Sequence, residues 1–143
     1  MSTIININAE IAAGVEKVWD YYTNPTHIIK WNFASDDWIC PHAENDLKVG
    51  GKYKARMEAK DGSFGFDFEA EYEEVKPLRK LVYKIADGRN VTITFEEKDN
   101  KTIVETEFEA ENTHPVEMQK AGWQAILNNF KKSSGKRIRE VVY

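Results

Sequence analysis

Cysteine and histidine are the residue types in this chain best suited to metal binding or nucleophilic catalysis, and they are few. Cys40 has His42 two positions after it, whereas His27 and His114 lie far apart in the sequence. Zinc normally takes three or four protein ligands, so Cys40 and His42 are too small a set for a metal site. A Cys40 nucleophile served by His42 or His114 would need an orienting third group, and none stands out. The sequence therefore predicts no metal site and no catalytic residue of this kind.

Carboxylates are the other candidates for acid–base chemistry. Most of them alternate with apolar residues in strand-like segments, where we expect them on the solvent face. They are Glu69, Glu71, Glu73, Glu74, Glu96, Glu97, Glu105 and Glu107. Asp36 and Asp37 lie instead in an irregular segment that could reach a pocket mouth, but a catalytic role would need a shifted pKa that a sequence does not reveal. No phosphate-binding loop or dinucleotide fingerprint is present, so we expect no cofactor.

The composition is typical of a soluble globular protein. The chain has 143 residues, 41% hydrophobic and 31% charged, with a net charge of −4. This predicts one folded domain over residues 1–143 rather than a disordered chain. Without a basic excess, nucleic acid is not an expected partner. A single cysteine, no leader-like start and no membrane-length apolar run together favour a cytoplasmic protein without membrane contact.

Period-two alternation predicts strands through much of the chain. Residues 3–11 form the first, residues 33–50 are expected to be irregular, and Gly50-Gly51 marks a bend before a run of further strands. These strands are separated by turn signals at Asp61-Gly62, Lys76-Pro77, Asp87-Gly88 and Asp99-Asn100. Strands joined by short turns favour an antiparallel meander, and its apolar face needs a cover.

Three helices are expected to supply that cover. The first begins at Gly14, and Asn24-Pro25 ends it and begins a short second helix. The last has Thr113 as its expected N-cap and Pro115 in its first turn. Its apolar face comprises Val116, Trp123, Leu127 and Phe130, and Ile138 and Arg139 are expected to continue it. The basic residues at its end fit the negative end of the helix dipole; they are Lys131, Lys132, Lys136, Arg137 and Arg139.

The order strand, two short helices, meander and long helix resembles the SRPBCC/START-like helix-grip superfamily. Within it, the chain resembles the activator of Hsp90 ATPase homologue 1-like branch. The motifs that carry the resemblance are Val18-Trp19 with Asn24-Pro25 and Trp31; Leu47 to Tyr53 with its Gly50-Gly51; Met57 with Asp61-Gly62; Val75, Pro77 and Leu81-Val82-Tyr83; and Gly122-Trp123 with Leu127. The segment after Trp31 departs from many relatives, because its proline comes later, at Pro41. The resemblance implies an α+β fold whose curved antiparallel sheet wraps around the C-terminal helix.

The resemblance also implies a cavity between sheet and helix, and the many aromatic residues agree with one. Stiff rings on a curved sheet leave gaps that a helix does not always fill, and apolar pockets are common ligand sites. The alternative is that these rings pack as ordinary core. The candidate ligand-binding residues are Phe33, Trp38, Tyr53, Met57, Phe64, Phe66, Phe68, Tyr83, Trp123 and Phe130. The hydroxyls of Tyr53 and Tyr83 are candidates for orienting a ligand.

Three functions follow from this picture. The favoured one is binding of a small lipophilic molecule or lipid by a monomer or homodimer. The resemblance implies a second, a chaperone-accessory domain with a chaperone as partner, although one fold hosts many functions. The third is a polyketide cyclase-like enzyme that uses the same pocket. We favour binding over catalysis.

Overall fold

The computed structural model describes residues 3–135, which form seven strands and three helices. In chain order the elements are β1 (Ile4–Ile11), α1 (Val15–Thr23), α2 (Pro25–Ile28), β2 (Trp38–Asn45), β3 (Lys52–Ala59), β4 (Gly65–Lys76), β5 (Lys80–Ile85), β6 (Asn90–Lys98), β7 (Lys101–Glu109) and α3 (Val116–Ser134). The strands make one sheet, ordered β1-β7-β6-β5-β4-β3-β2, in which every neighbouring pair is antiparallel.

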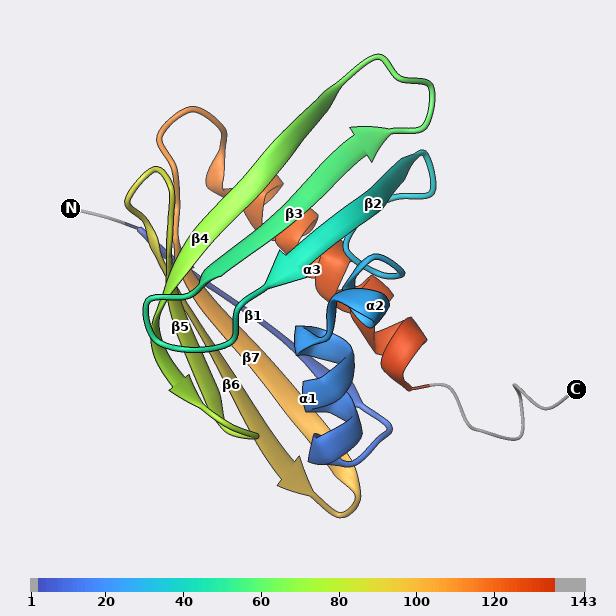
Figure 1. Ribbon diagram of the computed structural model, residues 1–143, viewed down its shortest axis with the longest axis vertical. Coiled ribbons are helices and arrows are strands. Elements are labelled where there is room, and N and C mark those ends of the chain that lie inside the picture. The colour runs from blue at the N-terminus through green and yellow to red at the C-terminus, as the bar shows by residue number, and fades with distance from the viewer. Residues whose placement is uncertain (1–2, 136–143) are drawn as a thin grey trace, which may run out of the picture.

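The sheet curls around α3, and α1 and α2 lie beside its open side (Figure 1). The chain leaves β1 at one edge, passes through both short helices, and starts β2 at the opposite edge. It then meanders back until β7 pairs with β1. This arrangement confirms the α+β helix-grip fold that the sequence predicts.

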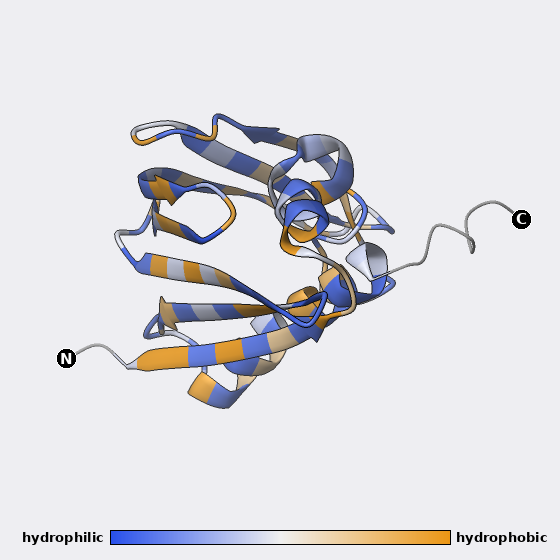
Figure 2. Cartoon of the chain, turned by 90° about the horizontal axis from the view of Figure 1, so that it is seen from below, coloured by the Kyte–Doolittle hydropathy of each residue, from blue (hydrophilic) through white to orange (hydrophobic). Residues whose placement is uncertain are grey.

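The alternation along the strands sets which face is buried. In β1, Ile5, Ile7, Ala9 and Ile11 are buried while the residues that alternate with them are exposed. Hydrophilic and hydrophobic residues alternate visibly along the strands in Figure 2. Because successive strand side chains point to opposite faces, this pattern gives the sheet a polar, solvent-exposed convex face and an apolar concave face. The predicted meander is confirmed.

The tight turns also follow from local sequence. Asp99 and Asn100 both have positive φ, 54° and 64°, which matches the primed turns that suit hairpins. At the bend before β3, Gly50 has φ 83°, and a Cβ on Gly51 would lie 2.0 Å from the Asp46 carbonyl oxygen. The predicted bend at Gly50-Gly51 is therefore both a conformational and a steric requirement for glycine.

The expectation that residues 33–50 are irregular is wrong, because β2 forms there. Cys40 and Ala43 are both buried although they are three positions apart, and the pairing of β2 with β3 shifts between Ile39 and His42. Such a bulge breaks the period-two signal that marks a strand. It also holds Pro41, which an edge strand tolerates because an edge strand has no second neighbour to bond.

The start of α3 also differs from the prediction. Pro115 rather than Thr113 is the N-cap, and no side chain caps it. The preceding turn is held instead by Gln119, whose side-chain amide donates to the carbonyls of Glu111 and His114 at 3.1 and 2.8 Å. Its Oε1 accepts from the Glu111 amide at 2.8 Å. Ser133 lies within the helix, and the predicted continuation through Ile138 and Arg139 lies outside the described residues.

Candidate ligand-binding cavity

A cavity of about 290 Å³ lies between the concave face of the sheet and α3. Its lining comes from β1, α1, the segment after α2, β3, β4, β5, the turn between β5 and β6, β7 and α3; the residues are Ile7, Tyr22, Trp31, Asn32, Tyr53, Met57, Phe66, Phe68, Tyr83, Arg89, Thr106, Trp123, Ile126 and Leu127. The helix packs directly against β1 and α1, whereas β3, β4 and β5 face it across this space. The curl of the sheet thus produces the cavity.

Aromatic packing fixes the apolar walls. Trp123 of α3 stacks on Phe108 of β7, with ring centroids 3.9 Å apart and an interplanar angle of 13°. On another wall, the Trp31 indole nitrogen donates to the Tyr21 carbonyl at 2.8 Å, which satisfies its polar atom. Its ring meets Phe130 edge-on at 4.9 Å. Both tryptophans therefore present fixed apolar surface to the cavity.

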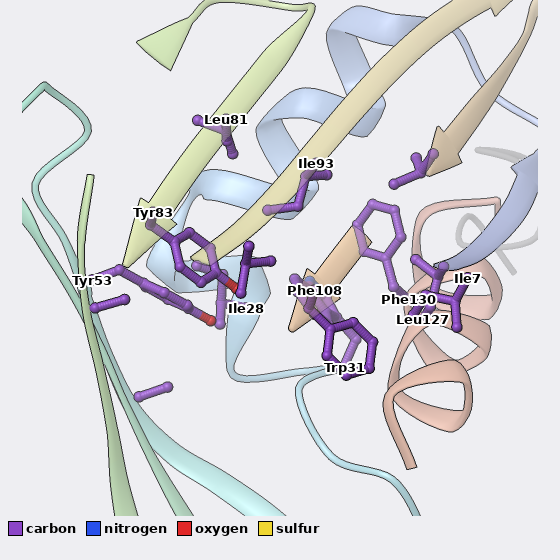
Figure 3. Packing of buried hydrophobic residues seen from close by; sticks show 14 of the residues in the cluster. Ile7, Ile28, Trp31, Tyr53, Leu81, Tyr83, Ile93, Phe108, Leu127 and Phe130 are labelled. Carbon is purple, nitrogen blue, oxygen red and sulfur yellow. The ribbon is translucent and has the colours of Figure 1, made fainter. Parts of the chain in front are cut away.

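One part of the lining is polar but uncharged. It comprises Asn32, Tyr53, Tyr83, Tyr22 and Thr106. The Asn32 side-chain amide donates to the Tyr53 hydroxyl at 3.3 Å. The rings of Tyr53 and Tyr83 lie 6.0 Å apart, and Figure 3 shows their hydroxyl oxygens directed the same way. We call these five residues the polar pole of the cavity.

The tyrosines of the polar pole are neutral hydrogen-bonding groups. Burial raises the pKa of Tyr53 and of Tyr83 well above 10, and neighbouring tyrosines raise both further. Burial likewise raises the pKa of Tyr22, partly offset by its interaction with Thr106. Desolvation disfavours the phenolate, so each ring keeps its proton at neutral pH. The polar pole therefore offers donors without charge.

Arg89 is the single charged residue among the described residues that line the cavity. It follows the Asp87-Gly88 turn and precedes β6, and its side chain is 22% exposed. Its Nε donates to Asp87 at 2.8 Å and its Nη1 to the Glu109 carbonyl at 3.1 Å. These bonds hold the guanidinium in place and partly balance its charge.

Six of the ten residues predicted to bind a ligand border the cavity, and four do not. Those that do are Tyr53, Met57, Phe66, Phe68, Tyr83 and Trp123. Phe130 is fully buried and packs as core, and Phe33 packs at the edge of that core. Trp38 and Phe64 instead meet each other edge-on at 5.9 Å near the β3–β4 hairpin, where Phe64 is 61% exposed.

Several lining residues were not predicted. Ile7 and Thr106 occupy inward positions of their strands and Ile126 and Leu127 lie on α3, so periodicity marked them as core without separating core from lining. Tyr22 and Trp31 were likewise recognisable as apolar helix-face residues. Asn32 and Arg89 carried no local signal, because only the approach of distant elements brings them to the cavity.

None of the candidate catalytic or metal-binding side chains borders the cavity. Asp37 accepts from the Ser35 hydroxyl, and neither Asp36 nor Asp37 borders the cavity. Burial raises the pKa of Cys40, whose Sγ donates to the His42 carbonyl at 3.5 Å. The three histidines each pair with a different carboxylate, on Asp20, Glu44 and Glu111. Within residues 3–135 no three such groups cluster in a way that could hold a metal ion.

Comparison with known proteins shows which family the chain resembles in sequence. The family model described as "Activator of Hsp90 ATPase homolog 1-like protein" matches residues 12–135. Among functionally curated proteins, no match was found. Within the described residues, no helix combines the length and apolarity required to cross a bilayer.

Solved structures support the same placement. An AHSA1-like protein from Aeromonas hydrophila is 40% identical, with a TM-score of 0.87 over 92% of this chain and 91% of its own. Chr148 from Cytophaga hutchinsonii is 46% identical, with a TM-score of 0.79 over 90% and 89%. CV1439 from Chromobacterium violaceum, at 22% identity and a TM-score of 0.81 over 91% and 96%, shares the fold.

Proposed function

We propose that this chain, which belongs to the Activator of Hsp90 ATPase homolog 1-like family, binds a small hydrophobic molecule in the cavity between its sheet and α3. The observation that carries the proposal is the cavity itself, about 290 Å³ and walled mainly by aromatic and aliphatic side chains. Ligand sites typically combine such walls with a few placed polar groups. The tyrosines and Asn32 supply those groups.

The size of the cavity limits the ligand. An engineered apolar cavity of about 150 Å³ accommodates one benzene ring. The space here is roughly twice that, and its wall is mostly apolar. A guest of about two rings, or an aliphatic molecule of similar volume, would fill it. Burying such a guest removes apolar surface from water, which is the main source of affinity in a site of this kind.

Titration with naphthalene tests the proposal. We expect saturable shifts in the amide resonances of residues that line the cavity, such as Tyr83, Thr106 and Leu127, because a two-ring hydrocarbon matches the available volume. Amides on the convex face, such as that of Ile103, should not shift. Absence of saturable binding, or shifts confined to the convex face, would contradict the proposal.

A pair of tryptophan variants supplies the matched control. Ile126→Trp adds volume inside the cavity, whereas Ile103→Trp adds the same side chain on the convex face, where Ile103 is 40% exposed. We expect naphthalene affinity to fall at least tenfold in the first variant and to stay unchanged in the second. Equal affinities in a folded Ile126→Trp protein would place the binding site elsewhere.

The two alternative functions have less support from this geometry. A cyclase-like enzyme needs a positioned base, but the described lining residues include no carboxylate or histidine. A chaperone partner needs exposed apolar surface, and the aromatic group of Trp38, Phe64 and Phe66 provides a small one. Titration of this chain with intact Hsp90 would separate the chaperone role from ligand binding. If the chaperone role holds, Phe64→Ser should weaken the binding of Hsp90 and leave the binding of naphthalene unchanged.

A further inference from the structure

The most informative group in the cavity is the Tyr83 hydroxyl. Tyr83 is only 5% exposed, and its ring is held by Tyr53, Phe68 and Tyr72 at centroid distances of 6.0 to 6.2 Å. Within the described part of the chain, its hydroxyl makes no hydrogen bond, yet Tyr83 borders the cavity. Among the described residues, the fully buried side-chain atom without a partner is Glu74 Oε2 and not the Tyr83 hydroxyl, so this hydroxyl is open to the cavity rather than sealed in the core. A polar group open to a cavity bonds to what occupies that cavity, either water or the acceptor atom of a ligand.

Tyr53 adds a second donor beside it. Its hydroxyl oxygen already accepts a hydrogen bond from Asn32, at 3.3 Å, which leaves its own proton to be donated. The two tyrosine hydroxyls are directed the same way in Figure 3, and their rings are 6.0 Å apart. An acceptor atom that reaches the polar pole therefore meets two phenol protons, one from β3 and one from β5, the strands on either side of β4.

Tyr72 shows that this arrangement is particular to the cavity. It belongs to the same tyrosine cluster, with its ring 6.0 Å from that of Tyr83. Its hydroxyl, however, donates to the Asn45 side chain at 2.8 Å, and Asn45 donates in turn to the Thr23 carbonyl at 2.7 Å. Tyr72 does not border the cavity. A closed protein network thus satisfies this hydroxyl, whereas that of Tyr83 has no such network.

The charge of the site selects against an anion. The polar pole contains tyrosine, threonine and asparagine and no cation. Moving a carboxylate from water into such a place costs much more than two neutral donors return. The cation on the lining, Arg89, is already bonded to Asp87 and to the Glu109 carbonyl. A neutral acceptor avoids the cost of burying a charge and does not need Arg89 as a partner.

We propose that the cavity selects a roughly two-ring ligand carrying a neutral hydrogen-bond acceptor, such as a ketone oxygen, which binds between the hydroxyls of Tyr53 and Tyr83. This inference rests on the proposed function and adds the chemical class of the ligand. The rings occupy the apolar walls near Trp123 and Phe68, and the acceptor lies at the polar pole. No covalent step is involved.

Three probes that share a naphthalene ring test the proposal. They are 2-acetylnaphthalene, which has a neutral ketone; 2-isopropenylnaphthalene, which has the same shape without the acceptor; and 2-naphthoate, which carries a charge. Hydrogen bonds from the two hydroxyls should make the ketone bind at least about threefold more tightly than the isopropenyl compound. We expect the naphthoate to bind at least tenfold more weakly than the ketone, because its charge would be buried without a partner.

Tyr83→Phe identifies the residue responsible, and Tyr72→Phe is its control. We expect Tyr83→Phe to remove most of the preference for the ketone while leaving the affinity for 2-isopropenylnaphthalene unchanged. Tyr72→Phe should preserve the preference, since that hydroxyl lies outside the cavity lining. Both variants keep the ring and its packing, so both are expected to fold.

The outcomes separate this inference from the function on which it rests. If none of the three probes binds, the proposed function fails. If the two neutral probes bind equally, or if Tyr83→Phe leaves the ketone preference intact, the cavity binds ligands but the inference is overturned. Tighter binding of naphthoate that is lost in Arg89→Gln would also overturn it, because the anchor would then be the cation.

Discussion

The two halves of the sheet differ in how their concave apolar faces are covered. The half formed by β1, β7 and β6 lies under α1 and α3 and is filled largely by aliphatic side chains; Ile11, Val91, Ile93 and Val104 are fully buried there. We call this the packed half. The half formed by β3, β4 and β5 presents Tyr53, Met57, Phe68 and Tyr83 to the cavity, and we call it the cavity half.

The difference shows how a stable fold accommodates an internal space. Where a helix touches the sheet, branched aliphatic residues fill the interface at crystal-like density. Where the sheet curls away from the helix, side chains must be long to reach inward, and rings do so without closing the gap completely. Tyrosine adds a polar atom at the end of its reach. The stability of the molecule should therefore depend mainly on one half and its binding mainly on the other.

Truncation should separate the halves most strongly. We expect Ile93→Ala to lower the free energy of unfolding by about 3 to 4 kcal/mol, because it opens a new hole in a closely packed region. Phe68→Ala, beside a space that already exists, should cost less than about 2 kcal/mol despite removing more atoms. Urea denaturation of both variants measures this, and equal losses would show that the cavity half is as tightly packed as the other.

Substitution by a larger side chain should destabilise the packed half more than the cavity. Val91→Phe inserts a ring into the packed half and should cost about 1 to 3 kcal/mol or more, because neighbours must move. Ile126→Trp has the cavity to expand into and should change stability by less than about 1 kcal/mol. Thermal denaturation without ligand measures both. A large loss in Ile126→Trp alone would mean that the space is unable to admit added atoms.

High pH should weaken the protein through the tyrosines of the cavity half. The pKa values of Tyr53 and Tyr83 are raised above 10 in the folded state, so above pH 10 the unfolded chain binds fewer protons than the folded one. Stability is then constant below pH 10 with respect to these groups and falls as pH rises beyond it, by up to about 1.4 kcal/mol per pH unit for each group. Tyr83→Phe should make that fall shallower between pH 10 and 11 in urea titrations, whereas an unchanged slope would contradict the shift.

The smallest effect is expected just outside the cavity half. Phe64 is exposed in the β3–β4 hairpin loop, while Phe68, four residues later on β4, lines the cavity. Phe64→Ala should change stability by less than about 0.5 kcal/mol, since surface substitutions away from packed features cost little. Measured beside Phe68→Ala, it shows whether binding and stability depend on the inward ring alone. A loss comparable with that of Phe68→Ala would indicate that the exposed aromatic group is structural.

Predictions from sequence succeeded where the conformation or burial of a residue depends on its near neighbours along the chain. The alternation that buries Ile5 and Ile7, the Asn24-Pro25 break and the Asp99-Asn100 turn are all local signals. The predictions failed where a residue that is distant in sequence but close in space overrides the local pattern. The bulge in β2 depends on its pairing with β3, and the start of α3 depends on the side chain of Gln119.

Apart from β2, the sequence by itself determined the elements, their order and which face of each is apolar, because period and turn chemistry are properties of adjacent residues. Tertiary structure alone decided where the apolar face closes and where it stays open. Phe130 and Trp123 share one face of α3, yet one is sealed in core and the other borders the cavity. The local curl of the sheet against the helix sets that distinction, and it likewise brings Asn32, Tyr53 and Tyr83 to one polar pole from distant parts of the chain.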